Sequence, residues 1–421
     1  MMTNINKITS NVGISDKLVI LLVALFPLTM ITGNLLINLT FISLFIIFIL
    51  DTTFNKNFIF LKDITFWIIF YFFCTLLFNI YFSLDPMNSL SRVLKILLMI
   101  SFAMQIKKVI QKYPLVFKKI ILNSWLVIFS IVLIDVVFEI IFGFNTLGYK
   151  SNYPTRISSF FGDEHVVGGY FLAFCIFYIS QISLLLNKYK KSLIGLILVL
   201  IFISLLIGER SNSIKFIISM SIFFVLVIKP NLKSALLILV IFLLSFFSFI
   251  NLNETLKYRY KTFFSKTITQ ESSFKVFLKN SQHIAHYDAS IKIFQEYPVF
   301  GVGLKNFRNE VGKTKYRNEN VYTIMRKSTH PHQLHFELLS ETGLFGYISF
   351  FIFIGVSLYL SIKNYFINRD IIQLSAIIYI ITSIIPILPS GSFFSTFTSA
   401  LFWINYSIMM GYNKNNFFVK S

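Results

Sequence analysis

The chain has 421 residues, of which 56% are hydrophobic and only 13% are charged, and its formal net charge is +20. This composition excludes a soluble globular domain, because several apolar runs exceed the roughly 18 residues that mark a membrane span. The excess of lysine and arginine is typical of loops retained on the cytoplasmic side of a membrane, and no nucleic-acid partner is predicted. The sequence therefore predicts an all-α, polytopic membrane protein.

Apolar runs along the chain predict about twelve transmembrane helices. They cover residues 17–33, 34–50, 64–82, 92–106, 120–143, 168–186, 192–208, 213–229, 234–252, 343–362, 371–388 and 395–412. Helices are expected because backbone groups in lipid must be hydrogen-bonded within their own segment. The spans divide the chain into residues 1–252 with nine helices, a long polar loop over 253–342, and residues 343–421 with three helices.

The basic residues of the short connections predict the orientation of these spans. Connections on the side of the N-terminus carry most of these residues, including Lys107, Lys108 and Lys112, whereas the opposite connections carry few. By the positive-inside rule, both ends of the chain are expected in the cytoplasm and the 253–342 loop outside. The basic residues of that loop do not count against this orientation, because long loops cross largely regardless of charge.

Two acids lie in the fifth predicted span, and a charged loop follows it. Asp135 and Glu139 are four residues apart and share a helix face. Acids within a membrane are functional candidates by default, although these two could instead pair with Arg156 or Arg210 to hold the fold. The loop after the span also carries Glu164 beside a histidine.

Two arginines are candidates for binding an anionic substrate. Arg210 follows an almost wholly apolar span, where a charge is costly unless it meets a partner or a ligand. A guanidinium group is planar, always charged and able to bind in a bidentate manner, so it suits a phosphate. The alternative for Arg210 is an interfacial pair with Glu209. Arg308 is a second outside cation, and its alternative is an ordinary solvated loop charge.

The long polar loop ends in a histidine cluster. An amphipathic helix is predicted around Ala289–Phe294, ended by Pro298 and followed by a turn at Gly301-Val302-Gly303. Three of the six histidines, His330, His332 and His335, then lie within six residues.

Pro331 within this cluster is expected in the first turn of a helix, with His332 directly behind it. The helix N-terminus would lower the pKa of His332 and keep its imidazole neutral, as a general base requires. The alternatives are interfacial polar residues and zinc ligands. The spacing is not His-Glu-x-x-His and no second ligand cluster accompanies it, so no metal is predicted.

Some motifs are missing from the sequence. It has no P-loop, no Gly-rich dinucleotide fingerprint and no Asp-x-Asp pair for a metal-bound nucleotide sugar. Neither a nucleotide energy source nor a nucleotide-sugar donor is therefore indicated. A glycosyl group moved by this protein would have to come from an activated lipid.

Three segments resemble one known family, the O-antigen ligases and polymerases. The string His332-Gln333, nine residues, then Gly343-Leu344-Phe345-Gly346 resembles the ligase motif His-[Asn/Ser/Gln]-x9-Gly-x-x-Gly. Pro298-Val299-Phe300-Gly301-Val302-Gly303 resembles the Pro-Leu-x-Gly-Val-Gly pattern of the superfamily, and Gly208-Glu209-Arg210-Ser211 is similar to its small-residue and arginine segment. Twelve spans with a large outside loop between the ninth and tenth also match the family plan.

The resemblance implies a glycosyltransferase at the periplasmic face of the bacterial inner membrane. Its donor would be a glycan on undecaprenyl pyrophosphate, and its acceptor lipid A–core for a ligase or another lipid-linked repeat unit for a polymerase. The implied reaction needs no ATP, metal or cofactor. The resemblance makes His332 the catalytic base that activates the acceptor hydroxyl, with Glu341 as a second catalytic candidate, and gives pyrophosphate binding to Arg210.

The chain departs from the family pattern at one place. Many relatives have an arginine four residues before a tryptophan, where this chain has His283 and Tyr287. Arg308 is therefore the expected second pyrophosphate ligand, with His283 and His286 as further candidates. Secondary site candidates are His330, Arg156, Glu164, Asp135 and Glu139. Outside the family, the alternative is a lipid-linked glycan transporter, which would place its charges near the middle of the membrane rather than on the outer side.

Overall fold

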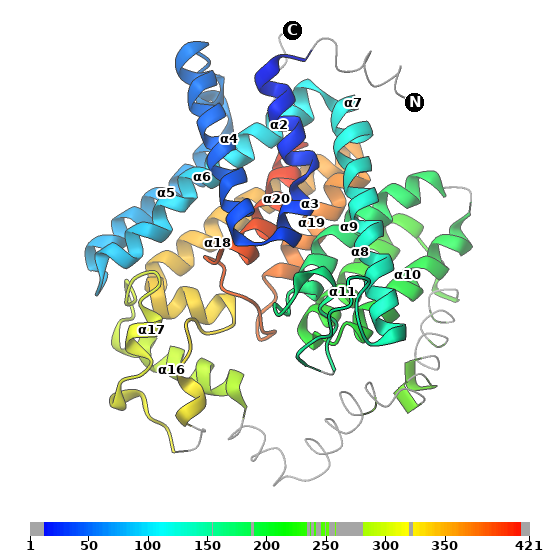
Figure 1. The fold of residues 1–421 in the computed structure, drawn as a ribbon. Helices are drawn as coiled ribbons and strands as arrows, with labels where there is room; N and C mark the ends of the chain where they lie inside the picture. Colours follow the sequence, from blue (N-terminus) through cyan, green and yellow to red (C-terminus); the bar gives the residue numbers. More distant parts are fainter. Residues whose placement is uncertain are drawn as a thin grey trace.

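A computed structural model of the protein describes residues 12–153, 155–186, 189–233, 281–319 and 323–413, with a few isolated residues between 236 and 257. Within these ranges every regular element is helical (Figure 1). The longer helices are α2 Ile14–Ala24, α4 Asn34–Phe54, α5 Ile64–Asn79, α6 Pro86–Lys112, α8 Leu122–Phe142, α9 Val167–Leu185, α10 Lys190–Leu206, α11 Arg210–Phe223, α16 Gln282–Glu296, α18 Leu334–Asn368, α19 Ile371–Ser383 and α20 Thr396–Gly411. The shorter ones are α3 Phe26–Thr32, α7 Pro114–Val116 and α17 Phe307–Glu310.

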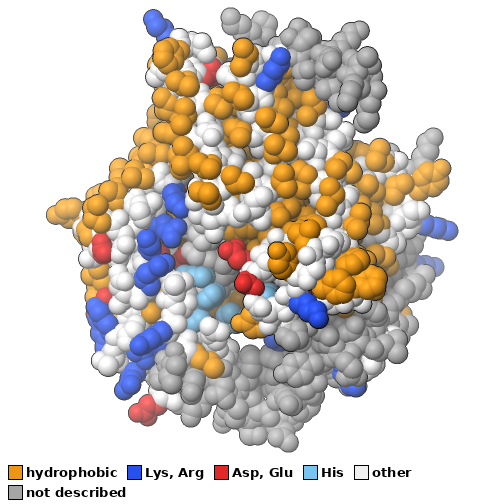
Figure 2. Space-filling view, viewed as in Figure 1, with side chains coloured by type: hydrophobic (Ala, Val, Ile, Leu, Met, Phe, Trp, Pro, Cys, Tyr) orange, Lys and Arg blue, Asp and Glu red, His pale blue; other side chains and the backbone are white. Residues whose placement is uncertain are grey.

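The protein is a multi-pass membrane protein. Six stretches of described helix are long and apolar enough to cross a membrane: α4, α5 with the turn after it, α7–α8, α9, α11 with the turn after it, and α18. The pair α2 and α3, bent by 52°, brings the total to as many as seven. Hydrophobic side chains cover much of the bundle on the face seen in Figure 2.

The twelve predicted spans are therefore supported only in part. Four of them fall on α6, α10, α19 and α20, which are not among the six. Helices α10, α19 and α20 are only 17, 13 and 16 residues long, and a helix needs about 20 to cross the hydrocarbon core unaided. The predicted span 234–252 lies mostly outside the described residues.

Helix α20 runs through the middle of the bundle (Figure 1). It packs against α6, α19, α4 and α9, and its residues 400–410 are all buried. A helix that is buried on every face is expected to be largely apolar. The rings of Trp403 and Tyr406 pack at tilted angles against Phe353 of α18. This helix, which was predicted as a span, forms the interior of the fold.

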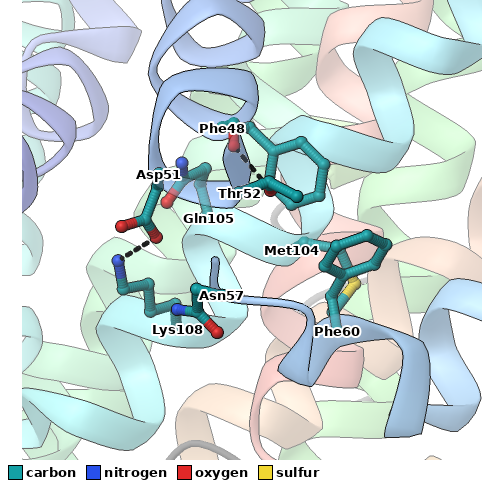
Figure 3. Close-up of a pocket in the computed structure, with 8 residues that line it drawn as sticks. All are labelled: Phe48, Asp51, Thr52, Asn57, Phe60, Met104, Gln105 and Lys108. Atoms are coloured by element: carbon teal, nitrogen blue, oxygen red, sulfur yellow. Dashed lines mark hydrogen bonds and ion pairs between the residues drawn. The ribbon is translucent and has the colours of Figure 1, made fainter. Parts of the chain in front are cut away.

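One end of the bundle is held together by ion pairs. Lys108 of α6 lies 2.7 Å from Asp16 of α2 and 2.9 Å from Asp51 of α4, and Lys107 lies 2.8 Å from Asp63 before α5. Figure 3 shows a pocket beside the Asp51–Lys108 pair, with a volume of about 20 Å³. That is room for about one water molecule.

The other end of the bundle, called here the site end, carries α16, α17 and the loops around them (Figure 1). Helix α16 begins at the cap Ser281 and ends at Glu296, two residues before Pro298, which confirms the predicted amphipathic helix and its stop. Helix α18 is broken at Gly343, where φ is 62°. A short helix over 334–342 therefore precedes the membrane-crossing part of α18. The break coincides with residue 343, where the sequence predicted that the span begins.

Candidate active site

Two of the motif segments form one joint at the site end. The amides of Val302 and Gly303 donate to the carbonyls of Ser340 and Glu341 at 3.0 and 2.8 Å. A Cβ on Gly301 would lie 2.5 Å from the Glu341 carbonyl carbon. Glycine is required there because the two backbones touch.

The joint continues on the far side of the α18 break. The amides of Leu344 and Phe345 donate to the carbonyls of Pro298 and Val299 at 2.9 and 3.0 Å. A Cβ on Gly343 would lie 2.3 Å from the Val299 carbonyl oxygen. The histidine segment is thus locked onto the loop that follows α16.

Four histidines gather beside this joint. The ring centroid of His332 lies 4.0 Å from that of His330, 5.1 Å from that of His286 and 5.9 Å from that of His283. His286 is fully buried, whereas His332 is half-buried and His283 exposed. The structure therefore brings together His283 and His286 of α16 with His330 and His332, although more than forty residues separate the two pairs in the sequence.

His332 was predicted in the first turn of a helix, but the structure places it before the helix. Helix α18 begins at Leu334, and its cap is Gln333, whose side chain accepts from the amide of Phe336 at 3.1 Å. His332 precedes the helix in a left-handed conformation, with φ at 59°. The predicted contribution of the helix N-terminus to its neutrality is therefore wrong, because the residue lies outside the helix.

The histidines are kept neutral by their surroundings. Burial, with the neighbouring His283 as a smaller cause, lowers the pKa of His332 to about 4. Burial and the adjacent imidazoles lower the pKa of His286 to about 4 and that of His330 to about 3. All are below the usual histidine value of about 6.5, so the imidazoles are unprotonated at neutral pH.

His335, the third histidine of the sequence cluster, points elsewhere. Its ring nitrogens lie 3.0 Å from the Tyr347 hydroxyl and 2.8 Å from the Ile384 carbonyl. It therefore fastens α18 to the segment after α19. In the part of the chain that the structure describes, no three His, Cys, Asp or Glu side chains are arranged to hold a metal ion.

The segment between α19 and α20, residues 384–395, is an element that the sequence analysis missed. The amide of Ser390 donates to the His332 carbonyl at 2.8 Å, and the Ser211 hydroxyl donates to the Pro389 carbonyl at 2.5 Å. Two adjacent residues of one loop thus hold the histidine segment and the start of α11. Its apolar first half resembled a membrane span, whereas Pro386, Pro389 and Gly391 were the signals of a loop.

Arg210 is the first residue of α11 and is exposed. Arg156 lies close to it, because the amide of Ile157 donates to the carbonyl of Ile207 at 3.1 Å. Burial is the largest cause of a lowered pKa of His283. The positive charges of both arginines lower this pKa further. The histidine cluster therefore has two arginines on its His283 side.

Arg308 lies on another side of the cluster. It is exposed on α17, and its charge contributes to the low pKa of His330, after burial and the neighbouring imidazoles. Arg308 also interacts electrostatically with Arg92 of α6 and with Glu341.

Glu341 and Glu337 lie in the short helix before the break, and both are buried. The Glu341 carboxylate accepts from the amides of Lys305 at 2.8 Å and Phe307 at 3.4 Å. The Glu337 carboxylate accepts from the amide of Phe393 at 2.8 Å and from the Ser392 hydroxyl. These carboxylates hold the two loops that border the histidine cluster.

Asp135 and Glu139 have partners in the loop that follows their helix. Asp135 accepts from the amide of Thr146 at 2.8 Å and from the Ser159 hydroxyl at 2.5 Å. Glu139 accepts from the amides of Ser158 and Ser159 at 3.1 and 2.6 Å. The structure thus gives these acids loop-holding contacts. Glu164 is exposed on the same loop.

Residues 194–351 match the family model described as O-antigen ligase. No curated protein matches the chain at a significant level. The matched stretch contains Arg210, α16, the glycine joint and His332, so it includes both sides of the histidine cluster. The protein is therefore a multi-pass membrane protein that carries an O-antigen ligase domain over residues 194–351.

Proposed function

We propose that the protein transfers a glycan from undecaprenyl pyrophosphate to a hydroxyl group of lipid A–core, at the periplasmic face of the bacterial inner membrane. The observation that carries this proposal is the loop over 384–395, which binds the histidine segment and the start of α11 through adjacent residues, Ser390 and Pro389. A neutral imidazole and a phosphate-binding arginine then border one site, as a transfer from a sugar diphosphate requires.

His332 acts as the general base in the proposed reaction. Its imidazole takes the proton of the acceptor hydroxyl while the hydroxyl oxygen attacks the anomeric carbon of the donor sugar. The bond from that carbon to the diphosphate oxygen breaks, and the lipid diphosphate leaves with the electron pair. A single displacement of this kind inverts the anomeric configuration.

Arg210 stabilises the leaving diphosphate, and we assign Arg156 as its partner. Fixed cations aimed at a developing negative charge lower the barrier more than the same cations in water. Arg156 replaces Arg308 as the best second ligand, because Arg156 and Arg210 act on the same imidazole, that of His283. Of the two histidines predicted as pyrophosphate ligands, His283 lies on this side of the cluster, whereas His286 is fully buried.

Glu341 is assigned as a positioning residue rather than as a second catalytic group. Its carboxylate is already occupied by two loop amides, so it fixes the loop over 301–307 against α18. Glu341→Gln should then lower kcat and leave the pH dependence of transfer unchanged in shape. A changed pH profile would instead support a direct role in proton transfer.

The test of the general base is transfer by the purified protein from a lipid-diphosphate glycan to lipid A–core. His332→Ala should lower kcat by about 10²–10⁴-fold, the usual contribution of a general base. Arg210→Ala should also abolish efficient transfer, whereas Arg317→Ala, an exposed arginine away from the cluster, should not. His335→Gln is the matched histidine control and should lower thermal stability while retaining turnover. Full activity of His332→Ala would refute the mechanism.

A repeat-unit polymerase is the alternative, because it uses the same donor and differs only in its acceptor. A deletion strain separates the two on a lipopolysaccharide gel. Loss of all long glycan from the core, with lipid-linked chains accumulating, identifies a ligase. A single repeat unit left on the core identifies a polymerase, and unaltered lipopolysaccharide excludes both.

A further inference from the structure

Four cations gather near the histidine cluster, apart from Arg156 and Arg210. Arg92 and Lys95 lie in the first turns of α6. Lys305 follows the glycine turn, and Arg308 lies on α17. The loop that carries the second pair is tied to the start of α6, because the Leu84 amide donates to the Val302 carbonyl at 3.0 Å.

The side chains of α6 are held in place at this position. Arg92 donates to the Phe394 carbonyl at 2.7 Å, and Lys95 donates to the Thr396 hydroxyl at 3.2 Å. Arg92 interacts electrostatically with Arg308, and Lys95 interacts with Arg92 and Lys305. The four cations, called here the α6 cation cluster, thus act on one another.

The α6 cation cluster has no close acidic partner among the described residues. Within the described residues, none of its four members forms an ion pair with an acid within 4.0 Å. The acids that interact with Arg92, Glu337 and Glu341, already accept from backbone amides. Like charges held together in a partly buried place repel one another, so this arrangement favours binding of an anion.

Figure 2 shows one face of the molecule, with Lys and Arg side chains in blue and His side chains in pale blue. Lys and Arg side chains form a column directly beside the histidines on the face seen there. The electrostatic contacts place Arg308 near His330 and place Arg156 and Arg210 near His283. The ring of His332 lies next to both of those imidazoles.

We propose that the α6 cation cluster is a second anion site, which binds a phosphate or diphosphate group of the acceptor. This inference rests on the proposed function, because an acceptor is a substrate only if transfer occurs. Arg156 and Arg210 hold the donor diphosphate on one side of His332, and the α6 cation cluster holds the acceptor on the other. The acceptor hydroxyl is thereby brought to the imidazole.

The phosphate has two chemical sources. A ligase acceptor would carry it as phosphate esters on the sugars of lipid A–core, and a polymerase acceptor would carry it as the diphosphate of a lipid-linked repeat unit. Both present an anion to the same cations. The source therefore distinguishes the two reactions that the proposed function leaves open.

The experiment measures transfer by the purified full-length protein with three acceptors. These are phosphorylated lipid A–core, the same core after removal of its phosphates by a phosphatase, and a lipid-diphosphate repeat unit. Arg92→Gln, Lys95→Gln and Arg308→Gln are compared with the wild type, with Arg92→Lys as the charge-conserving variant. Lys313→Gln, an exposed lysine paired with Glu310, is the matched control.

Each glutamine variant should raise KM for the anionic acceptor at least tenfold and leave KM for the donor unchanged. Arg92→Lys should restore most of the acceptor affinity, and Lys313→Gln should behave as the wild type. The dephosphorylated core should be used at least tenfold less well by the wild type, if core phosphate is the source. Preference for the lipid diphosphate would identify that source instead.

Two outcomes would overturn this assignment. One is an acceptor KM that none of the three glutamine variants changes, and the other is a donor KM that rises in place of the acceptor KM. In both cases the proposed function stands, because the wild type still transfers the glycan. Absence of transfer by the wild type with every acceptor would overturn the proposed function itself, and this inference with it.

Discussion

His332 shows how a single residue acquires its chemistry from residues far away in the chain. Its backbone is in the left-handed region at φ 59°, where residues other than glycine are uncommon, and its carbonyl is held by the Ser390 amide. Its neutrality comes from burial and from His283, which lies on another helix. The sequence predicted a neutral imidazole but attributed its neutrality to a helix N-terminus. The cause is instead burial and a neighbouring imidazole, and the local segment does not specify which residues surround the side chain after folding.

The first prediction concerns the pH dependence of transfer. The pKa of His332 is lowered to about 4 in the protein without substrate, so kcat/KM, which reports the free enzyme, should fall only as the pH drops toward about 4. A bound diphosphate is an anion near the imidazole and favours its protonated form, so it raises this pKa. The acid limb of kcat, which reports the bound enzyme, should therefore lie at a higher pH than that of kcat/KM.

The control for this prediction is His283→Gln. The charge of His283 disfavours protonation of His332, so its removal should move the acid limb of kcat/KM to higher pH. The measurement is a full pH–rate profile of both kinetic parameters for wild type and variant. Coincident acid limbs for kcat and kcat/KM in the wild type would show that the diphosphate does not bind beside His332.

At the scale of elements, the site depends on the joint between the turn after α16 and the break in α18. Gly343 has φ 62° and ψ −166°, a conformation that is open almost only to glycine. Gly343→Ala should destabilise the protein by about 1–3 kcal/mol from backbone strain alone, and the clash with Val299 adds to this. Thermal unfolding in detergent, followed by tryptophan fluorescence, measures the change.

Gly355→Ala in the same helix is the matched control. A Cβ there meets nothing within 4 Å, and replacing a helical glycine by alanine typically stabilises a helix by roughly 0.5–1 kcal/mol. It should therefore unfold at the wild-type temperature or slightly above it. Equal destabilisation by both substitutions would argue against a special role for the break.

The loop over 384–395 gives a second prediction at this scale. Ser390→Pro removes the amide that holds the His332 carbonyl, whereas Ser390→Ala retains it. A displacement of about 1 Å in a catalytic group can cost about 10²-fold in rate, so Ser390→Pro should lower kcat by that order. Ser390→Ala should keep wild-type turnover. Similar kcat values for both variants would mean that His332 does not depend on this amide.

The helices themselves were largely predictable, and the way they assemble the site was not. Apolar runs predicted the helices because a membrane span must be apolar, and Pro298 and Gly301 marked a stop and a turn through their own backbone limits. Residues 384–388 were predicted as the end of a span, since isoleucine and leucine look alike in a loop and in a helix. Arg92 was not singled out, because its relation to Arg308 exists only after folding.

At the scale of the whole molecule, the two ends of the helical bundle carry different charged groups. Lys108 pairs with Asp16 and Asp51 at one end, and the histidine cluster with Arg156 and Arg210 lies at the other. The positive-inside rule predicts that the ion-paired end faces the cytoplasm and the site end the periplasm. The proposed donor and acceptor meet the protein only if this orientation holds.

Single cysteines test the orientation directly. Cys74 and Cys175 are first replaced by serine, and a cysteine is then introduced at Asn309 of α17 or at Lys56, both of which are exposed. A membrane-impermeant maleimide should label Asn309→Cys once the outer membrane is made permeable. Lys56→Cys should react only after the inner membrane is also disrupted. The reverse pattern would place the histidine cluster in the cytoplasm, where no periplasmic glycan could reach it.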